Sequence, residues 1–212
     1  MISMFYVKEI FKSIQGEGYF SGKKAVFVRF TGCNLWNGKV SDRKNSICSF
    51  CDTDFIGTDG KNGGVYTHEG LVRKVRDVWG NHDSKEKFLV FTGGEPTLQI
   101  TSKLVDYLKN EGFFIALETN GTIDNKILYD WVCVSPKSMK NWVLKTGDEV
   151  KVIFPQIGLD LNLIKKMNFN FFFLQPMDGN KRQVNVWNTI NYCKSHKPWF
   201  PSFQIHKTLN IN

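Results

Sequence analysis

Short apolar runs recur along the chain and predict the strands of a parallel β-sheet. They cover residues 25–31, 88–92, 113–118, 131–135, 150–154, 171–175 and 202–205. Several of these runs are almost continuously apolar, and such runs are typical of parallel strands that are covered on both faces. We therefore expect an α/β protein built around a central sheet.

Helical patterns lie between some of the expected strands. Apolar residues at helical spacing predict helices near 71–79, 104–108, 161–167 and 184–193, and no helix is predicted between 135 and 150. Thr101 or Ser102 is the expected N-cap of the second helix, and Gly112 is its expected stop. A full eight-fold barrel needs about 250 residues. The shorter, irregular alternation predicts a partial, open (βα) barrel with reduced helices, forming one domain over 1–212.

Composition narrows the class of protein. Apolar residues make up 42% of the 212 residues, which argues against disorder. The N-terminus lacks the pattern of a signal peptide, and no run is long enough to span a bilayer, so a cytoplasmic location is expected. Five cysteines in such a chain are expected to be ligands or buried thiols rather than disulfides. Cys133 and Cys193 fall in apolar patterns and are expected to be buried thiols.

The formal net charge of +8 raises the possibility of a nucleic-acid partner. However, the lysines are scattered, and no RNA-binding or helix-turn-helix signature is found. A pocket for an anionic small molecule fits the charge better.

Polar or glycine-rich segments follow most of the expected strands. They begin at Cys33, Gly93, Glu118, Ser135 and Gln175, and at Gln204 with His206 after the last strand. Ligands of parallel βα folds bind at the carboxyl ends of the strands. We therefore expect these segments to form one shared site.

Three cysteines carry the strongest chemical signal. Fourteen residues separate Cys33 from Cys48, and two separate Cys48 from Cys51. A structural zinc site normally has four ligands, whereas an iron–sulfur cluster on three thiolates keeps one iron open for chemistry. A zinc site completed by Asp52 or His68 is the alternative.

Other residues are weaker signals when each is taken alone. Two glycines and Glu95 could admit a ligand amine, although Gly93-Gly94 could equally be a simple turn. Arg29 lies in an apolar strand, where it would either hold an anion from inside the fold or lie on an exposed face. Thr53 could ligate Mg²⁺ or be an ordinary loop residue.

Two terminal segments complete the set. The Ser13–Gly18 segment could be a glycine-rich hairpin turn or part of the site. The short tail that carries His206 is expected to dock back and close the pocket.

Taken together, these motifs resemble the radical S-adenosylmethionine (SAM) superfamily and, within it, the 7-carboxy-7-deazaguanine synthase family. The resemblance runs over the whole chain, through the segments 13–18, 29–35, 51–55, 92–96, 118–121, 135–137, 175–178 and 204–207. The long first gap between the cysteines is found in one branch of this family.

The resemblance implies a lyase that converts 6-carboxy-5,6,7,8-tetrahydropterin to 7-carboxy-7-deazaguanine with loss of ammonia. Its implied cofactors are a [4Fe–4S] cluster, SAM and Mg²⁺, and no side chain is implied to carry the radical. Its implied partners are a homodimer mate and an electron donor such as a flavodoxin or ferredoxin, with no nucleic acid and no membrane. The remaining alternatives are a glycyl-radical activating enzyme and a non-enzymatic zinc module that binds nucleic acid.

The resemblance also implies residue roles. The cluster ligands are Cys33, Cys48 and Cys51, and the Mg²⁺ ligand is Thr53. The implied SAM contacts are Phe50, Cys51, Asp52, Gly94, Glu95, Ser135, Pro136, Lys137, Gln175, Pro176, Met177 and Asp178. The implied substrate contacts are Ile14, Gln15, Gly16, Arg29, Thr92, His206 and the terminal carboxylate of Asn212.

Overall fold

A computed structural model describes residues 4–80 and 86–211 of the chain. Within them the structure forms one nine-stranded sheet, in the order β3-β1-β2-β4-β5-β6-β7-β8-β9. The strands are β1 (Phe5–Ile14), β2 (Lys24–Phe30), β3 (Gly64–Tyr66), β4 (Lys87–Gly93), β5 (Phe113–Thr119), β6 (Trp131–Val134), β7 (Thr146–Phe154), β8 (Asn168–Pro176) and β9 (Trp199–Pro201).

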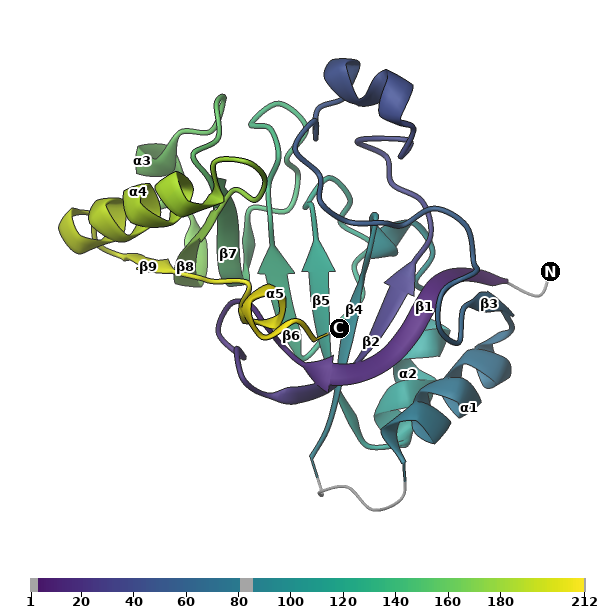
Figure 1. Cartoon of the computed structure of the whole chain (residues 1–212). Coiled ribbons are helices and arrows are strands. Elements are labelled where there is room, and N and C mark those ends of the chain that lie inside the picture. Colours follow the sequence, from purple (N-terminus) through teal and green to yellow (C-terminus); the bar gives the residue numbers. More distant parts are fainter. Residues whose placement is uncertain (1–3, 81–85, 212) are drawn as a thin grey trace.

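The seven strands β2 and β4 to β9 pair in parallel. They form the open, curved sheet of Figure 1, which is the expected partial barrel. Their almost continuously apolar sequences are buried because helices or other segments cover the sheet. Strand β1 joins the edge antiparallel to both β2 and β3, with a register shift between Val7 and Glu9. The sequence pattern had not predicted β1, β3 or β9.

The helices are α1 (His68–Trp79), α2 (Ser102–Asn110), α3 (Leu161–Ile164), α4 (Arg182–Ser195) and α5 (Ile205–Leu209), with 3₁₀ turns η1 (Val40–Asn45) and η2 (Pro96–Leu98). The four expected helices are confirmed, and Thr101 caps α2 by accepting from the Leu104 amide. Figure 1 shows α1 and α2 beside one end of the sheet, and α3 and α4 beside the other. No helix in the described part of the chain is long and apolar enough to cross a membrane.

Two apolar clusters form most of the core. The larger packs α1 and α2 against β1, β2, β4 and β5, and the second packs β7, β8 and β9 around Trp142 and Ile164. Cys133 is buried, as expected, whereas Cys193 is only half-buried and packs against the second cluster.

The prediction of a strand over 202–205 was wrong. The last strand ends at Pro201, and α5 begins at Ile205. The apolar character of this segment reflects its docking against the rest of the fold, because the Ile205 amide donates to the Gly16 carbonyl. His206 therefore lies on a short helix and not at a strand end.

Candidate active site

A cavity of about 400 Å³ opens at the carboxyl ends of the parallel strands. It gathers most of the residues that the sequence had marked. They are Ile14, Gln15, Gly16, Arg29, Cys33, Cys48, Phe50, Cys51, Asp52, Thr53, Thr92, Gly94, Ser135, Lys137, Gln175, Pro176, Met177, Asp178 and His206. These residues come from the ends of several strands, the cysteine loop and α5, so the structure brings the expected segments together around one cavity.

Two of the marked residues lie away from the cavity wall, and a third is not described. Pro136 is buried and is not part of the cavity wall. Asn212 lies outside the described residues. Glu95 is fully buried, away from the wall, and its carboxylate accepts from the Thr97 and Asn120 amides and from two threonine hydroxyls.

Glu95 therefore ties η2 to the end of β5, with Thr119 Oγ1 donating to Glu95 Oε1 at 2.9 Å. Its neighbour Gly94 reaches the cavity instead. A Cβ atom on Gly94 would lie 2.1 Å from the Gly32 carbonyl oxygen and 2.8 Å from Cys33 Cβ. Only glycine permits this close approach of the backbone to the first cysteine.

The three cysteine thiols converge on the cavity. A hydrogen bond from Cys48 lowers the pKa of Cys51 to about 6, and the same bond, together with burial, raises the pKa of Cys48. Burial raises the pKa of Cys33. Since no fourth cysteine of the described chain lines the wall, the donor set fits an iron–sulfur cluster that keeps one iron open.

The zinc site that included His68 does not form. His68 is buried at the start of α1, where its Nε2 is hydrogen-bonded to Thr101 Oγ1 at 2.9 Å and its ring packs against Phe5. Its role is structural.

The long segment between Cys33 and Cys48 forms η1 and braces the second pair of cysteines. Arg43 donates through Nη1 to the Cys51 carbonyl at 2.8 Å and to the Ser49 carbonyl at 3.2 Å. Its guanidinium lies 4.2 Å from the centroid of the Trp36 ring, and that ring packs edge-on against Phe55.

Arg29 and Thr92 are cross-strand neighbours in the β2–β4 register, so the two expected substrate contacts lie side by side on the wall. The guanidinium of Arg29 pairs with Glu9 of β1, with Nε 2.8 Å from Glu9 Oε1. Arg29 thus lies within the cavity and not on an exposed face.

Helix α5, near the end of the chain, contributes His206 and Lys207 to the cavity wall. It lies in front of the central strands in Figure 1. Lys207 Nζ lies 2.5 Å from Asp52 Oδ2 and 2.6 Å from Asp178 Oδ2, so it joins two of the expected SAM segments. Although burial lowers the pKa of Lys207, its hydrogen bonds to these carboxylates produce a net rise. A Cβ on Gly16 would clash with His206 Nδ1. Helix α5 therefore packs against the β1–β2 hairpin so closely that there is no space for a side chain at position 16.

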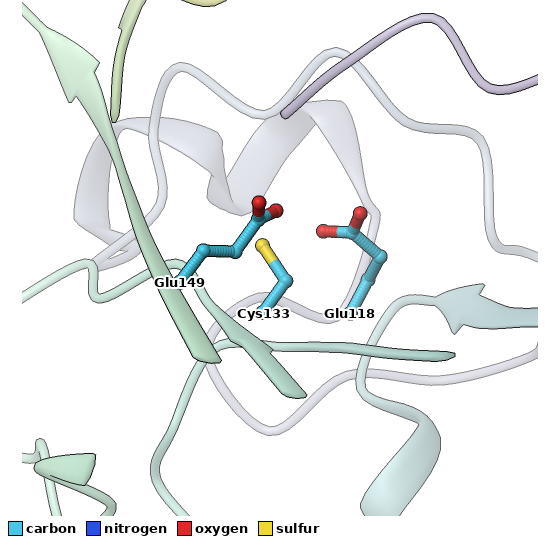
Figure 2. Close-up of side chains that lie close together, drawn as sticks. All are labelled: Glu118, Cys133 and Glu149. Atoms are coloured by element: carbon cyan, nitrogen blue, oxygen red, sulfur yellow. The ribbon is translucent and has the colours of Figure 1, made fainter. Parts of the chain in front are cut away.

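Strand register also creates a buried polar cluster that the sequence analysis had not marked. Glu118 of β5, Cys133 of β6 and Glu149 of β7 are successive cross-strand partners, so their side chains converge (Figure 2). Lys151 follows two residues after Glu149 and shares its face of β7. Burial raises the pKa of the Cys133 thiol and of Glu149, which favours their protonated forms.

Two charged residues of the wall, Glu9 and Lys151, lie outside every segment that the sequence had marked, and within the marked segments no role had been assigned to Glu17, Glu118 or Lys207. A usable signal existed for Lys151. It interrupts the apolar run 150–154, just as Arg29 interrupts its own strand, and a buried charge needs a partner.

Comparisons with known proteins agree with this geometry. No protein-family model matches the chain. It is 48% identical over 206 residues to 7-carboxy-7-deazaguanine synthase from Burkholderia multivorans, covering 97% of this chain and 98% of that protein. It is 45% identical over 206 residues to the enzyme of the same name from Bordetella pertussis, with the same coverage. The crystal structure of QueE from Escherichia coli superposes with a TM-score of 0.71 at 26% identity, covering 95% of this chain and 94% of that one.

Proposed function

Since the chain belongs to the 7-carboxy-7-deazaguanine synthase family, we propose how the residues of this cavity divide the work of the reaction. The protein is a radical SAM enzyme and a lyase of 7-deazapurine (queuosine) biosynthesis. The substrate is 6-carboxy-5,6,7,8-tetrahydropterin and the product is 7-carboxy-7-deazaguanine, with loss of ammonia. The observation that carries the assignment is the convergence of three cysteines and a charged, hydrogen-bonding wall on one cavity.

Cys33, Cys48 and Cys51 would hold the [4Fe–4S] cluster, because they are the only cysteines of the described chain in the cavity wall. When bound, the cluster and SAM would supply the radical chemistry that acts on the substrate. The lowered pKa of Cys51 favours its thiolate, the form that binds iron.

The walls of the cavity would orient SAM and exclude water from it. Gly94, together with the segments Phe50–Asp52, Ser135–Lys137 and Gln175–Asp178, would hold SAM. Lys137 donates to the Ser135 carbonyl at 2.7 Å, which fixes the shape of its own segment. We assign Glu95 to supporting Gly94 from behind the wall, because its carboxylate oxygens are already engaged.

Ile14, Gln15, Gly16, Arg29, Thr92 and His206 would bind the pterin, and we keep the carboxylate of Asn212 as a proposed contact. Arg29 would neutralise the substrate carboxylate because its guanidinium matches a carboxylate's geometry. Burial lowers the pKa of His206, so its imidazole would be neutral at pH 7 and would act as a hydrogen-bonding group.

Thr53 would ligate Mg²⁺, with the remaining positions left to substrate and water. Its location on the wall between Asp52 and Asp54 supports this assignment. Thr53→Ala should weaken the dependence of activity on Mg²⁺, whereas Thr53→Ser keeps the hydroxyl and should titrate like the wild type. Identical Mg²⁺ titrations for all three proteins would remove Thr53 from the metal site.

We also propose that residues 1–212 act as one domain, in the cytoplasm, as a homodimer that receives electrons from a flavodoxin or ferredoxin. The family resemblance supports these points. Sedimentation of the holoenzyme and reduction by each purified donor would test them.

The central experiment incubates anaerobically reconstituted protein with the pterin, SAM, Mg²⁺ and a reductant. Mass spectrometry should find 7-carboxy-7-deazaguanine with the wild type and none with Cys33→Ala. Release of 5′-deoxyadenosine without this product would overturn the substrate assignment. A colourless wild-type protein that forms neither compound would overturn the cluster assignment.

A further inference from the structure

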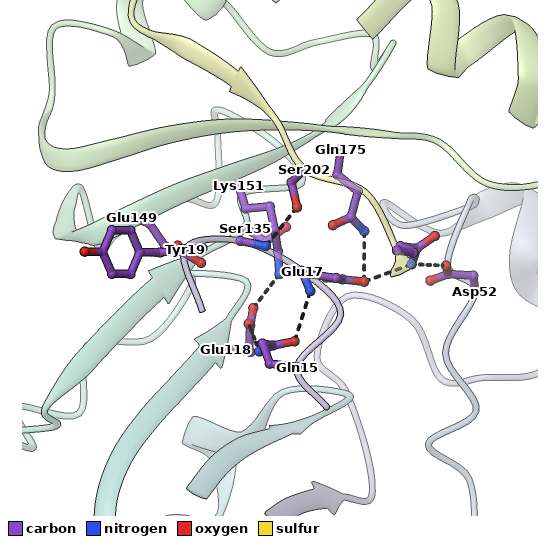
Figure 3. Close-up of polar contacts among 12 residues, drawn as sticks. Gln15, Glu17, Tyr19, Asp52, Glu118, Ser135, Glu149, Lys151, Gln175 and Ser202 are labelled. Carbon is purple, nitrogen blue, oxygen red and sulfur yellow. Dashed lines mark hydrogen bonds and ion pairs between the residues drawn. The ribbon is translucent and has the colours of Figure 1, made fainter. Parts of the chain in front are cut away.

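Lys151 places a buried ammonium beneath the cavity. The residue is 3% exposed, and its Nζ lies 2.7 Å from Glu17 Oε2 and 3.0 Å from Glu118 Oε2 (Figure 3). The two carboxylates come from different parts of the fold, the hairpin after β1 and the end of β5. One lysine of β7 therefore ties both to the floor of the site.

The two carboxylates differ in how far their hydrogen-bonding capacity is used. Glu17 Oε1 accepts from Gln175 Nε2 at 3.2 Å and from Gln204 Nε2 at 3.0 Å, while its Oε2 accepts from Lys151. Glu118 Oε1 has a long contact, 3.4 Å from Gln15 Nε2. Glu17 is thus held by protein donors on both oxygens, and Glu118 keeps acceptor capacity at the cavity wall.

The charge balance separates them further. Burial favours the protonated form of Glu17, but its interactions with Lys151 outweigh burial and lower its pKa. Two carboxylates around one ammonium leave one negative charge in excess. The side chains of Glu17 and Glu118 are equally exposed, at 18%, so the difference lies in their donors: Glu118 accepts fewer hydrogen bonds from the protein and can present that charge to a ligand.

A metal ion does not explain this cluster. Glu118, Cys133 and Glu149 lie close enough to suggest a ligand set (Figure 2), but Lys151 Nζ already lies 3.0 Å from Glu118 Oε2, and burial favours the neutral forms of Cys133 and Glu149. The ammonium supplies the positive charge that the buried acids need, and a second cation beside it would be repelled.

We propose that Lys151 is a positioning residue that neutralises Glu17 and thereby holds Glu118 as the charged acceptor for the N–H donors of the substrate ring. The inference rests on the proposed function, since a pterin carries an amino group and ring N–H donors on its pyrimidinone half. A carboxylate accepts such donors well, and losing a charged partner from a buried site costs more than losing a neutral one.

Charge-matched double variants test the proposal. Binding of the pterin to reconstituted holoenzyme is measured by calorimetry with SAM and Mg²⁺ but without reductant, so that no turnover occurs. Lys151→Met should weaken pterin binding about tenfold or more, while the affinity for SAM stays within about twofold. Lys151→Met combined with Glu17→Gln restores the excess of one negative charge on Glu118 and should recover most of the affinity.

The matched control is Lys151→Met combined with Glu118→Gln. It carries the same net charge but lacks the proposed acceptor, so its pterin affinity should stay low. Equal affinities for the two double variants, at equal melting temperatures, would overturn the proposal, and so would wild-type affinity in Lys151→Met. If the single variant fails to fold, the comparison of the two double variants still decides.

The wild-type protein separates this inference from the proposed function. A wild type that neither binds the pterin nor makes the product overturns the proposed function and the inference with it. A wild type that does both, beside double variants that behave alike, overturns the role of Lys151 alone.

Discussion

Glu9 accepts a hydrogen bond from Nε of Arg29 at 2.8 Å, across the antiparallel pair of β1 and β2. This contact uses one edge of the guanidinium and leaves its Nη groups for a carboxylate in the cavity. Both side chains are only about a quarter exposed, with side-chain exposures of 22% for Arg29 and 27% for Glu9. The pair therefore orients Arg29 more firmly than a surface ion pair would.

Glu9→Gln should raise the KM for the pterin by roughly three- to tenfold, because a neutral amide holds the guanidinium less firmly than a carboxylate does. The KM for SAM should change little. Arg29→Lys keeps the charge but loses the Nε contact and the planar fork, so it should raise the same KM by more. Steady-state kinetics with each substrate varied in turn would check this, and equal effects on both KM values would indicate a folding defect.

Replacing a cluster ligand should abolish iron binding, whereas replacing another cysteine should not. After reconstitution, Cys51→Ala should contain almost no iron and should lack the visible absorbance of the cluster, because it lacks the Cys51 thiolate that binds iron. Cys133→Ala is the control, since Cys133 is buried beneath the cavity and is not part of its wall. Iron assays on both proteins decide, and retention of a full cluster in Cys51→Ala would contradict the assignment.

The sequence predicted six of the seven parallel strands because their apolar runs are almost continuous, and it did not predict β9. It missed β1, whose polar positions such as Lys8 and Glu9 interrupt the apolar pattern at the edge of the sheet. It also placed a strand over 202–205, where the apolar residues dock a turn and a helix onto the hairpin after β1. Apolar character predicts burial, but a short run does not tell which element is buried.

Much of the candidate site was predictable because its residues follow strand ends. The contacts among Glu17, Glu118 and Lys151 were not predictable, because they depend on strand register and on a hairpin that folds over the sheet. The surroundings of Glu95 were not predictable either. Its position beside two glycines suggested a ligand contact, and in the structure its carboxylate also accepts from the Thr97 and Asn120 amides.

Arg43 provides a test of the long segment between the first two cysteines. Arg43→Ala removes the donor to the Ser49 and Cys51 carbonyls and the contact with Trp36. We expect the cysteine loop to loosen, so the reconstituted protein should lose iron several-fold faster to a chelator. Lys44→Ala is the matched control because Lys44 is an exposed neighbour on the same turn. Equal rates of iron loss in the two variants would show that Arg43 does not brace the loop.

Lys207 should determine how firmly α5 closes over the cavity, because it pairs with Asp52 and Asp178 on two different segments. Lys207→Met should speed amide exchange at Lys207 and Ile211 by about fivefold, equivalent to roughly 1 kcal/mol of local stability. These amides donate to carbonyls within the closing segment, at Gln204 and His206. Lys194→Met, on the exposed side of α4, should leave their exchange unchanged.

Salt gives an independent check on the same contacts. The side chains of Lys207, Asp52 and Asp178 are 29%, 38% and 28% exposed, so solvent ions partly reach them. Raising the ionic strength to about 1 M shortens the screening length to about 3 Å and should move wild-type exchange toward that of Lys207→Met. The variant, which lacks the charge, should respond much less. If salt accelerates exchange equally in both proteins, the closure of α5 does not depend on the charge of Lys207.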